Sequence, residues 1–458
     1  MKFKITQLVC LFIVCSIFVS AQNGWQSLFD GKTLNGWKQL TGTAGFNVEG
    51  GAITGTTVLN SPNSFLVSDK KFTGNFILEL EAKIEDTSMN SGVQFRSNYD
   101  ATQNDGKGKV FGYQFELDAS SRKWSGGLYD EGRRDWLYPG SLNKQGQDAF
   151  KLNEYNKIRI EVFGNTVKTW LNGTAVTYFV DSMIKNQGVI ALQVHGIGDD
   201  EKKGGEKVYF KNIRIKTSGI QPSAFTKGIY VVNLNANSLT DYEKRDGWRL
   251  LFDGKTSKGW ISARKNSFPE KGWVIKDGTI GALSSQGKES ANGGDIVTTE
   301  QFSAFDLSFQ FKLAVAGNSG VKYFVTLNEK NEGSAIGLEY QILDDSLHPD
   351  AKLGIAGNRT LASLYDLIKA NKQSRFIHQP DQWNTGRIIV YPNNHVEHYL
   401  NGVKVLEYER GSKEYRDLVA ISKYKIWDHF GEAKQGHILL QDHGDQVSFR
   451  SIKIRALK

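Results

Sequence analysis

The feature that most constrains the fold of this chain is an internal duplication. The decapeptide LFDGKTLNGW at residues 28–37 returns as LFDGKTSKGW at residues 251–260, and NSGV at residues 90–93 returns at residues 318–321. The shared motifs keep their order, and only insertions between them change their spacing. A repeat of this length predicts two homologous domains of about two hundred residues each.

A segment without a counterpart connects the two copies. With the copies at residues 22–217 and 247–458, the connection spans residues 218–246. Thr240 and Glu243 stand three positions apart near its end, which is the spacing of a capping box at a helix N-terminus. We therefore expect a short helix that leads into the second domain.

The rest of each copy has the alternating pattern of β-strands. Residues 76–84 (FILELEAKI) and 305–313 (FDLSFQFKL) alternate in hydropathy, and residues 158–162 and 167–171 flank a Gly-Asn turn as in a hairpin. Glycine is abundant, with 48 residues against 7 prolines, which suits many tight turns. Many short strands and few helical periods predict an all-β fold of two tandem jelly-roll β-sandwiches.

The first 21 residues have the pattern of a secretory signal peptide. Two lysines precede an apolar run at residues 8–19, and the small residue Ala21 precedes the expected cleavage site. Both cysteines of the chain, Cys10 and Cys15, lie in this segment, so the mature protein contains none. We therefore expect export to the periplasm or the extracellular space, with stability from a large core instead of disulfides.

The charge and hydropathy of the chain argue against a nucleic-acid partner and against a membrane span. The formal net charge of +8 is modest and the basic residues are scattered among acidic ones, so nucleic-acid binding is not expected. No stretch is apolar and long enough for a membrane span. The sequence contains no phosphate loop, dinucleotide fingerprint or Gly-x-Ser-x-Gly motif in the right context, and no organic cofactor is expected.

One repeated strand carries candidate functional side chains. It reads GVIALQVHG in the first copy and GHILLQDHG in the second, with a Gln and a His two positions apart in each. Residues two apart on a strand point to the same face. We therefore expect Gln193 and His195 to share a face in the first domain, and Gln441 and His443 in the second.

A second repeated strand carries a carboxylate and a carboxamide on one face. The first copy has Gln114 and Glu116 at the two positions where the second copy has Glu339 and Gln341. A solvated outer face is one interpretation of this strand alone. Together with the Gln-x-His strand, it favours a concave sheet face that binds a sugar or a metal ion.

Polar and aromatic residues follow these strands in both copies. Aromatic rings stack on the apolar faces of sugars and charged groups hydrogen-bond to hydroxyls, although an exposed, salt-bridged loop has the same composition. In the first copy the candidates are Asp118, Arg122, Trp124, Tyr129, Asp130, Glu131, Arg133, Arg134 and Trp136. In the second copy they are Asp344, His348, Arg359, Tyr365 and Asp366.

Two further sets of histidines and carboxylates bear on a metal site. Asp344 and His348 carry metal-ligand groups, although their spacing matches no tight zinc signature. His395 and His398 would face opposite sides of a strand, and we place His398 on the shared polar face. The first copy has threonine at the corresponding positions, so we expect the two sites to differ chemically.

The ordered motifs resemble those of the 3-keto-disaccharide hydrolase family. The matching segments are LFDGKTLNGW, YQFELD, SGGLYDEGRRDWLYPG and ALQVHGIG in the first copy and LFDGKTSKGW, EYQILDDSLHPDA, HVEHYLNG and GHILLQDHG in the second. The resemblance covers nearly all of the mature chain and implies a concanavalin A-like jelly roll in each copy. It also implies an enzyme for a glycoside or oligosaccharide that a separate oxidoreductase has oxidised at C3.

The resemblance implies a reaction that starts from the C3 carbonyl, which acidifies the C2 hydrogen. A base removes this hydrogen, the enolate expels the C1 substituent, and water adds to the resulting enone. Such a site requires a base, a stabiliser of the enolate oxygen and an acid for the leaving group. It does not require the carboxylate pair of conventional glycosidases.

We assign these roles to residues as a hypothesis. Imidazole titrates near neutral pH, so His443 and His195 are the expected bases of their domains. Glu339 and Glu116 are the expected acids or metal ligands. The expected sugar-orienting residues are Gln341, Gln441, Gln114 and Gln193, and the expected enolate stabilisers are a divalent metal ion, or Lys322 and Arg359 in the second domain and Arg96 in the first.

A non-catalytic function competes with this hypothesis. Jelly rolls of this class serve as lectins as readily as enzymes, so the protein could bind carbohydrate without turnover. A structural or adhesive role, with no ligand-dependent change, is a further alternative. Another interpretation divides the roles between the copies. The second copy has more histidines, which favours catalysis there, and the Arg- and Trp-rich loop of the first copy favours binding.

Overall fold

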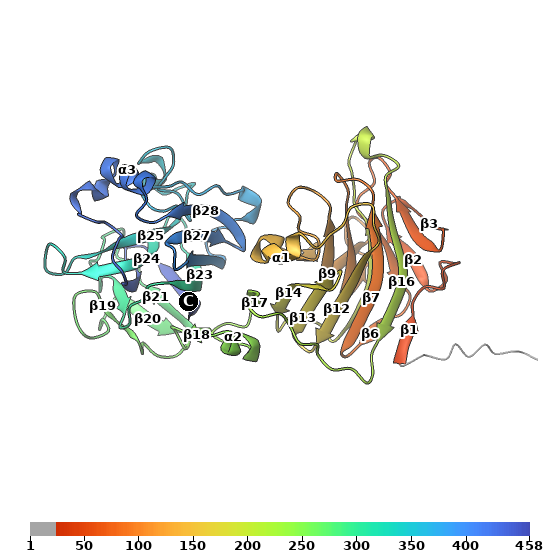
Figure 1. The fold of residues 1–458 in the computed structure, drawn as a ribbon, viewed down its shortest axis with the longest axis horizontal. Helices are drawn as coiled ribbons and strands as arrows, with labels where there is room; N and C mark the ends of the chain where they lie inside the picture. Colours follow the sequence, from red (N-terminus) through yellow and green to blue (C-terminus); the bar gives the residue numbers. More distant parts are fainter. Residues whose placement is uncertain (1–23) are drawn as a thin grey trace, which may run out of the picture.

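Two β-sandwiches lie side by side in the computed structural model of the protein (Figure 1). The structure describes residues 24–458. The expected signal peptide at residues 1–21 lies outside the described residues. The fold is all-β, with two tandem jelly-roll domains, as the duplication and the strand patterns predict.

The first sandwich consists of two antiparallel sheets. The first sheet has the order β17 (Val231–Asn233), β14 (Thr174–Val180), β13 (Thr166–Leu171), β12 (Asn156–Phe163), β7 (Phe76–Ile84), β16 (Lys207–Lys216), β4 (Ala52–Thr56) and β3 (Gly45–Glu49), with β1 (Trp25–Ser27) paired to β16. The second has the order β11 (Asp135–Tyr138), β10 (Leu128–Glu131), β9 (Lys109–Asp118), β8 (Asn90–Asp100), β15 (Gln187–Val194), β5 (Ser64–Ser68) and β2 (Trp37–Thr41), with β6 (Phe72–Thr73) paired to β15. Among the strands in the described part of the first domain, only β14 and β17 pair in parallel.

The second sandwich repeats this arrangement. Its first sheet has the order β20 (Trp273–Lys276), β21 (Thr279–Ala282), β30 (Val447–Ala456), β23 (Phe305–Leu313), β26 (Asn384–Val390), β27 (His395–Leu400) and β28 (Val403–Glu409), with β18 (Arg249–Leu250) paired to β30. Its second sheet has the order β19 (Trp260–Ser262), β22 (Ile296–Thr298), β29 (His437–Leu440), β24 (Asn318–Leu327) and β25 (Ala335–Leu343).

Helices are short and connect strands. The α-helices are α1 (Lys144–Gln147), α2 (Asp241–Arg245) and α3 (Lys413–Ile421), and the 3-10 turns are η2 (Gly140–Leu142), η3 (Glu201–Lys203), η4 (Pro349–Lys352), η5 (Ser374–Phe376) and η6 (Lys423–Ile426). The capping box expected at Thr240 is confirmed at the start of α2. Within residues 24–458, no helix combines the length and the apolar character needed to cross a bilayer.

The longest repeated motif has a structural role. In LFDGKT of the first copy, the Asp30 carboxylate accepts hydrogen bonds from the backbone N–H groups of Lys32 (2.8 Å) and Thr33 (2.7 Å). In the second copy, Asp253 accepts the same bonds from Lys255 (2.8 Å) and from the following threonine (2.7 Å). The motif therefore fixes a tight turn at the start of each sandwich.

Alternation along the strands separates a core face from a second, partly polar face. Phe115 on β9 and Leu192 on β15 belong to the core between the two sheets of the first domain. The neighbouring residues Val189 and Ala191 belong to a separate small apolar cluster on the other face of this sheet. Gln114, Glu116 and Gln193 have the same parity as that cluster, so they lie on its face.

The segment between the copies is built into both domains. Strand β17 adds to the edge of the first domain's sheet beside β14. Tyr230, just before β17, donates or accepts a hydrogen bond with Ser308 of β23 (Oη–Oγ 2.7 Å). Glu243 of α2 accepts a hydrogen bond from Lys453 of β30 (2.6 Å), and both side chains are buried. These contacts hold the two sandwiches together.

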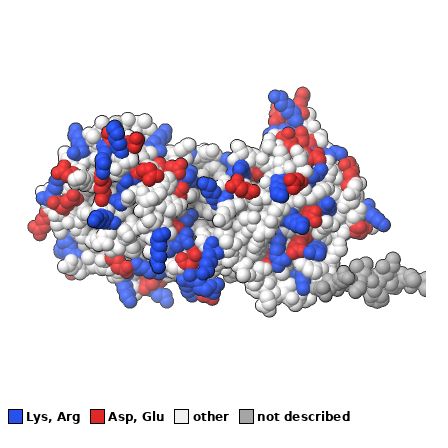
Figure 2. Space-filling model, in the orientation of Figure 1, with Lys and Arg blue, Asp and Glu red and all other residues white. Residues whose placement is uncertain are grey.

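Charged side chains are interspersed on the surface. Figure 2 shows lysine, arginine, aspartate and glutamate distributed over both domains on the visible face. This distribution agrees with the scattered charges of the sequence.

Candidate functional sites

A carboxyl group lies at the centre of a buried polar cluster in the first domain. Glu116 accepts hydrogen bonds from Asn90 (Nδ2–Oε1 2.6 Å) and from Gln114 (Nε2–Oε2 3.0 Å). Gln114 also donates to Gln193 (3.2 Å) and contacts the amide of Gln94 (3.4 Å). Burial raises the pKa of Glu116 to about 7. A carboxyl group with this pKa can exchange a proton near neutral pH.

Glycine makes room for these side chains in both copies. A Cβ atom at Gly92 would lie 2.3 Å from Cδ of Gln114, and one at Gly320 would lie 2.5 Å from Oε1 of Glu339. The carboxamide in the first domain and the carboxylate in the second therefore lie across the neighbouring strand. The repeated Asn-Ser-Gly motif is explained by this close approach.

His195 and Asp118 border a cleft at the end of this polar face. The cleft has a volume of about 440 Å³ and is also lined by Asn90 and Arg122. Asp118 accepts hydrogen bonds from Nε (3.0 Å) and pairs with Nη2 (2.9 Å) of Arg122. His195 Nδ1 lies 2.7 Å from the carbonyl oxygen of Gly196, so Nδ1 carries the hydrogen and Nε2 is an acceptor.

The aromatic residues of the first-domain loop pack mainly against one another. Trp124 is buried, with its ring 4.7 Å from that of Trp136 and 5.4 Å from that of Phe376 in the second domain. The ring of Tyr129 lies 5.3 Å from Trp136, and its hydroxyl donates to Asp135 (2.7 Å). These side chains shape the wall of the cleft and the domain contact.

The charged residues of the same loop form a paired network. Asp130 is fully buried and pairs with Arg133 (2.6 Å) and Arg134 (2.6 Å). Arg134 also pairs with Asp181 (2.8 Å), and Glu131 accepts a hydrogen bond from Asn63. These residues therefore form a salt-bridged loop, which is the alternative that their composition suggested.

Arg96 does not reach the polar face, and its expected role as an enolate stabiliser is wrong. Its guanidinium donates to the carbonyl oxygens of Phe72 (2.8 Å), Asn186 (2.9 Å) and Gly74. A positive φ of 53° at Arg96 marks an irregularity in β8 that turns the side chain toward these carbonyls. On the polar face of β8 the first domain instead has Gln94.

The second domain places an ammonium group beside its buried carboxylate. Lys322 on β24 stands directly opposite Glu339 on β25, and paired residues of antiparallel strands point to the same face. Lys322 Nζ also lies 4.0 Å from the carboxylate of Asp295. These two carboxylates raise the pKa of Lys322 despite its burial, so it stays protonated. Burial raises the pKa of Glu339, and Lys322 opposes that shift.

Gln341, Asn318 and His443 continue this cluster. With its amide nitrogen turned toward the acceptors, Gln341 donates to Glu339 Oε1 (3.1 Å) and to the carbonyl oxygen of Ser319 (3.0 Å). Asn318 Nδ2 lies 3.4 Å from Nε2 of His443. His443 is also among the groups that oppose the rise in the pKa of Glu339, after Lys322.

The expectation that Gln441 and His443 lie on a strand is wrong, because β29 ends at Leu440. The backbone N–H of Gln441 still donates to the carbonyl oxygen of Gly320 (3.0 Å), but the N–H of the next residue, Asp442, donates to the side chain of Asp295 (2.9 Å). The chain therefore leaves the sheet between these two residues. Oε1 of Gln441 is buried and has no hydrogen-bond partner among the described residues.

Arg359 is held in an ion-pair network at the rim of the second site. It pairs with Asp350 (3.0 Å) and Asp366 (2.7 Å), and Tyr365 donates to Asp350 (2.8 Å). Lys423 Nζ lies 4.1 Å from the ring centroid of Tyr365. Arg359 is thus held at the rim by two hydrogen-bonded carboxylates, whereas Lys322 stands directly opposite Glu339, so Lys322 is the better candidate for stabilising an enolate.

The placement of His398 on the polar face is wrong. His398 is fully buried, its Nε2 lies 2.8 Å from the hydroxyl of Tyr323, and its Nδ1 lies 3.1 Å from the carbonyl oxygen of Ala362. It shares its side of β27 with the core residues Val396 and Leu400. Burial lowers the pKa of His398 to about 4, so the ring is neutral inside the core.

Asp344 and His348, the expected metal ligands, each make hydrogen bonds to nearby backbone groups. The Asp344 carboxylate accepts hydrogen bonds from the backbone N–H groups of Ala316 (2.8 Å) and Ser346 (3.0 Å), so it stabilises a loop. Nδ1 of His348 accepts a hydrogen bond from the backbone of Asp350 (3.2 Å). Each of these side chains therefore has a local structural role in its loop.

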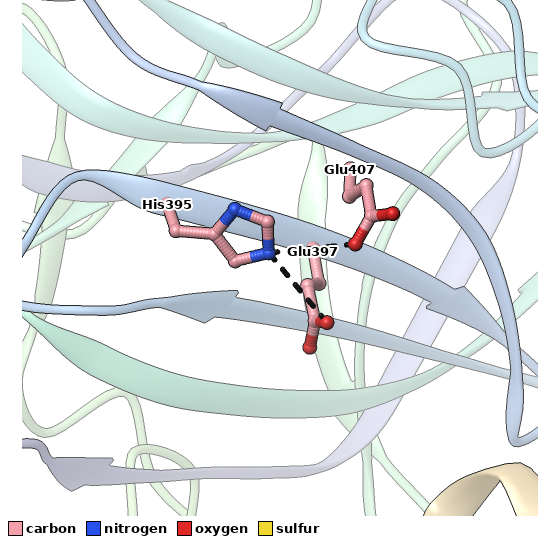
Figure 3. A group of neighbouring side chains, drawn as sticks. All are labelled: His395, Glu397 and Glu407. Atoms are coloured by element: carbon pink, nitrogen blue, oxygen red, sulfur yellow. Dashed lines mark ion pairs between the residues drawn. The ribbon is translucent and has the colours of Figure 1, made fainter.

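Another group of side chains has the spacing of metal ligands. His395, Glu397 and Glu407 on β27 and β28 face one another in Figure 3. Lys404 already pairs with Glu397 (3.2 Å) and Glu407 (2.7 Å), which compensates their charge. This group lies on the other sheet from Glu339 and is separate from the candidate site.

Comparison with known proteins agrees with the repeat. The profile of the 3-keto-alpha-glucoside-1,2-lyase-like domain matches residues 24–216 and again residues 247–455. The chain belongs to this family. A 3-keto-disaccharide hydrolase of Bacteroides thetaiotaomicron is 38% identical over 234 residues, which cover 46% of this chain and 79% of that protein. The family and this relative support the expectation of a glycoside-acting enzyme.

Two solved structures are also similar. A structure from Parabacteroides distasonis ATCC 8503, provisionally named a glycosyl hydrolase, is 29% identical with a TM-score of 0.42 and covers 49% of this chain and 100% of its own. The carbohydrate-binding module CBM66 from Bacillus subtilis is 18% identical with a TM-score of 0.24 and covers 40% of this chain and 95% of its own.

Several residues of the two sites were not predicted from the sequence. Asn90 and Asn318 belong to a repeated motif, so their recurrence was a usable signal. Asp295 lies in a loop and Lys423 begins η6, and no local sequence pattern marks either residue. Arg375 of the second domain borders the first domain's cleft, and only the three-dimensional structure brings it there.

Proposed function

We propose that the protein cleaves the glycosidic bond of 3-keto-glycosides and that the second domain performs the chemistry. The observation that carries this proposal is the placement of Lys322 opposite Glu339, beside His443. The family and the Bacteroides relative support the substrate class. The first domain has the neutral Gln94 on the corresponding strand face, and its nearest expected cation, Arg96, points elsewhere.

The proposed reaction is an elimination followed by hydration. His443 accepts the proton from C2, and the electrons of the C–H bond form an enolate with negative charge on the C3 oxygen. Lys322 stabilises this charge, which is the largest electrostatic demand of the reaction. Re-formation of the C3 carbonyl creates a C1–C2 double bond and expels the C1 oxygen, which Glu339 protonates. Water then adds to the C1–C2 double bond: its oxygen binds C1 while Glu339 takes its proton, and His443 returns a proton to C2. This step gives the 3-keto sugar and restores both side chains.

The test compares a chromogenic glucoside with its 3-keto derivative, each with and without a chelator. We expect release of the aglycone only from the keto sugar, and insensitivity to the chelator would exclude a required metal ion. Replacing His443→Ala should reduce turnover by about 10²–10⁴-fold, and Lys322→Met by about 10²–10³-fold. The matched variant His195→Ala in the first domain should retain activity. Release from the unoxidised glucoside, or full activity of His443→Ala, would contradict the proposal.

Binding without turnover would show itself in the same experiment. If neither sugar reacts but either one raises the melting temperature, a carbohydrate-binding protein is the better description.

We further propose that the chain is exported after cleavage before Gln22, which N-terminal sequencing of the mature protein tests. A separate oxidoreductase acting on the C3 hydroxyl would supply the substrate.

A further inference from the structure

We propose that the first domain's cleft binds an acidic sugar and that Arg375 of the second domain completes this site. The cleft of about 440 Å³ is formed mainly by first-domain residues, and Arg375 is its one lining residue from the other domain. Arg375 lies on η5, and the adjacent Phe376 packs against Trp124 with ring centroids 5.4 Å apart. The domain contact therefore fixes this guanidinium at the cleft.

Positive charge exceeds negative charge in the cleft. Its cations are Arg122, Lys203 and Arg375, and its only carboxylate among the described lining residues is Asp118. Arg122 already pairs with that carboxylate at 2.9 Å. Lys203 pairs with Asp200 at 3.5 Å, so the charge of Arg375 is the one that remains available to a carboxylate or sulfate group of a ligand.

Arg375 has no carboxylate partner within ion-pair distance in the described part of the chain. Its Nε donates to the side-chain oxygen of Gln373 (2.9 Å), and its guanidinium lies 4.6 Å from the ring centroid of Phe376. Burial and, after it, the neighbouring positive charge of Arg122 lower the pKa of Arg375. An anion between the two guanidinium groups would relieve this repulsion and occupy the free donors of Arg375.

Hydrogen-bond acceptors for sugar hydroxyls stand beside this positive region. His195 Nε2 is an acceptor, because Nδ1 carries the hydrogen that points to Gly196. The side-chain oxygen of Asn90 is buried and has no partner among residues 24–458, because its amide nitrogen is directed at Glu116. Acceptors at one wall and the guanidinium of Arg375 at another suit a sugar that bears both hydroxyls and a carboxylate.

The size and surroundings of the cleft fit one sugar ring with a substituent. A volume of about 440 Å³ lies within the usual range for small-ligand sites. Arg375 also borders a second cavity of about 640 Å³ between the domains, which Trp136 and Trp383 line. A substituent on the bound sugar can therefore continue past Arg375 along aromatic side chains.

Calorimetric titration of the full-length mature protein with methyl β-D-glucuronide and methyl β-D-glucoside tests this site. We expect the glucuronide to bind at least about tenfold more tightly at low salt. Arg375→Gln should weaken glucuronide binding by about tenfold without changing glucoside binding, and Arg375→Lys should retain part of the preference. Arg264→Gln, which changes an exposed arginine of the second domain outside both cavities, is the matched control.

Three results would overturn this proposal. They are failure of the glucuronide to bind, equal affinity for both glycosides, and an unchanged preference in Arg375→Gln. Because the assay measures binding, its outcome is independent of the proposed elimination reaction. Weaker glucuronide binding at high salt would support charge recognition.

Discussion

The replacement Glu116→Gln gives a direct test of the buried carboxyl group in the first domain. Burial raises the pKa of Glu116 from 4.5 to about 7 in the folded protein. Between these two values the unfolded chain has lost its proton while the folded domain retains it. The unfolded state therefore binds fewer protons, and stability falls as the pH rises through this window. Below pH 4.5 the penalty is absent, and above pH 7 it is complete.

The size of the penalty follows from the shift in pKa. Each unit corresponds to about 1.4 kcal/mol, so the full effect is about 3 kcal/mol, of which roughly 2–3 kcal/mol falls between pH 5 and pH 8. Glutamine carries no ionisable group and has nearly the same shape. Asn90 can rotate its unpartnered amide oxygen toward the new nitrogen, so the variant keeps its hydrogen bonds. Relative to the wild type, Glu116→Gln should gain this free energy as the pH rises.

The assay is urea unfolding at several pH values, followed by hydrogen exchange of peptides from β8 and β9. These peptides report the first domain separately from the second. Glu201→Gln, at an exposed position in η3, should change with pH as the wild type does. Only the difference between variant and wild type enters the comparison, so any pH-independent cost of the substitution cancels. A difference that stays constant within about 0.5 kcal/mol from pH 5 to pH 8 would refute the reasoning.

Two further substitutions test the second domain. Asp306 accepts hydrogen bonds from Arg387 (2.7 Å) and Arg455 (3.0 Å), and Arg455 also pairs with Asp246. Asp306→Leu therefore leaves the buried guanidinium of Arg387 unpaired and should cost about 3–5 kcal/mol in urea unfolding. A loss below about 1 kcal/mol would show that water reaches this group. In Gly320→Ala the new methyl group would lie 2.5 Å from the Glu339 carboxylate, so turnover of a 3-keto-glycoside should fall while the circular dichroism spectrum is retained. Unchanged turnover would show that the position of this carboxylate is not required.

The fold was largely predictable because hydrophobic alternation is a local signal. The expected strands at residues 76–84 and 305–313 coincide with β7 and β23. The end of β29 was not predictable, because the side chain of Asp295, far away in sequence, draws the chain out of the sheet before His443. Strand periodicity predicts which residues share a face, but it does not predict where a hydrogen bond from another loop ends the strand.

The sequence predicted those parts of the candidate site that repeated motifs and the alternation of side chains along a strand can indicate. Glu116 and Glu339 lie on the expected strand face, since side-chain direction alternates along β9 and β25. His398 shows the limit of the same argument, because parity gives two faces and does not say which one is the core. Two other placements depend on packing between distant segments. Lys404 neutralises the carboxylates beside His395, and Arg375 of the second domain reaches the cleft of the first.

The pairing of β17 with β14 has a consequence for how the two copies can be separated. A chain cut after residue 216 would retain β14 but lose the strand that covers its edge. A bare strand edge offers unpaired N–H and C=O groups to other chains and promotes aggregation. The smallest first copy that protects its own sheet therefore extends at least through Asn233. The duplication has thus produced a pair in which the connecting segment shields one copy from unwanted self-association.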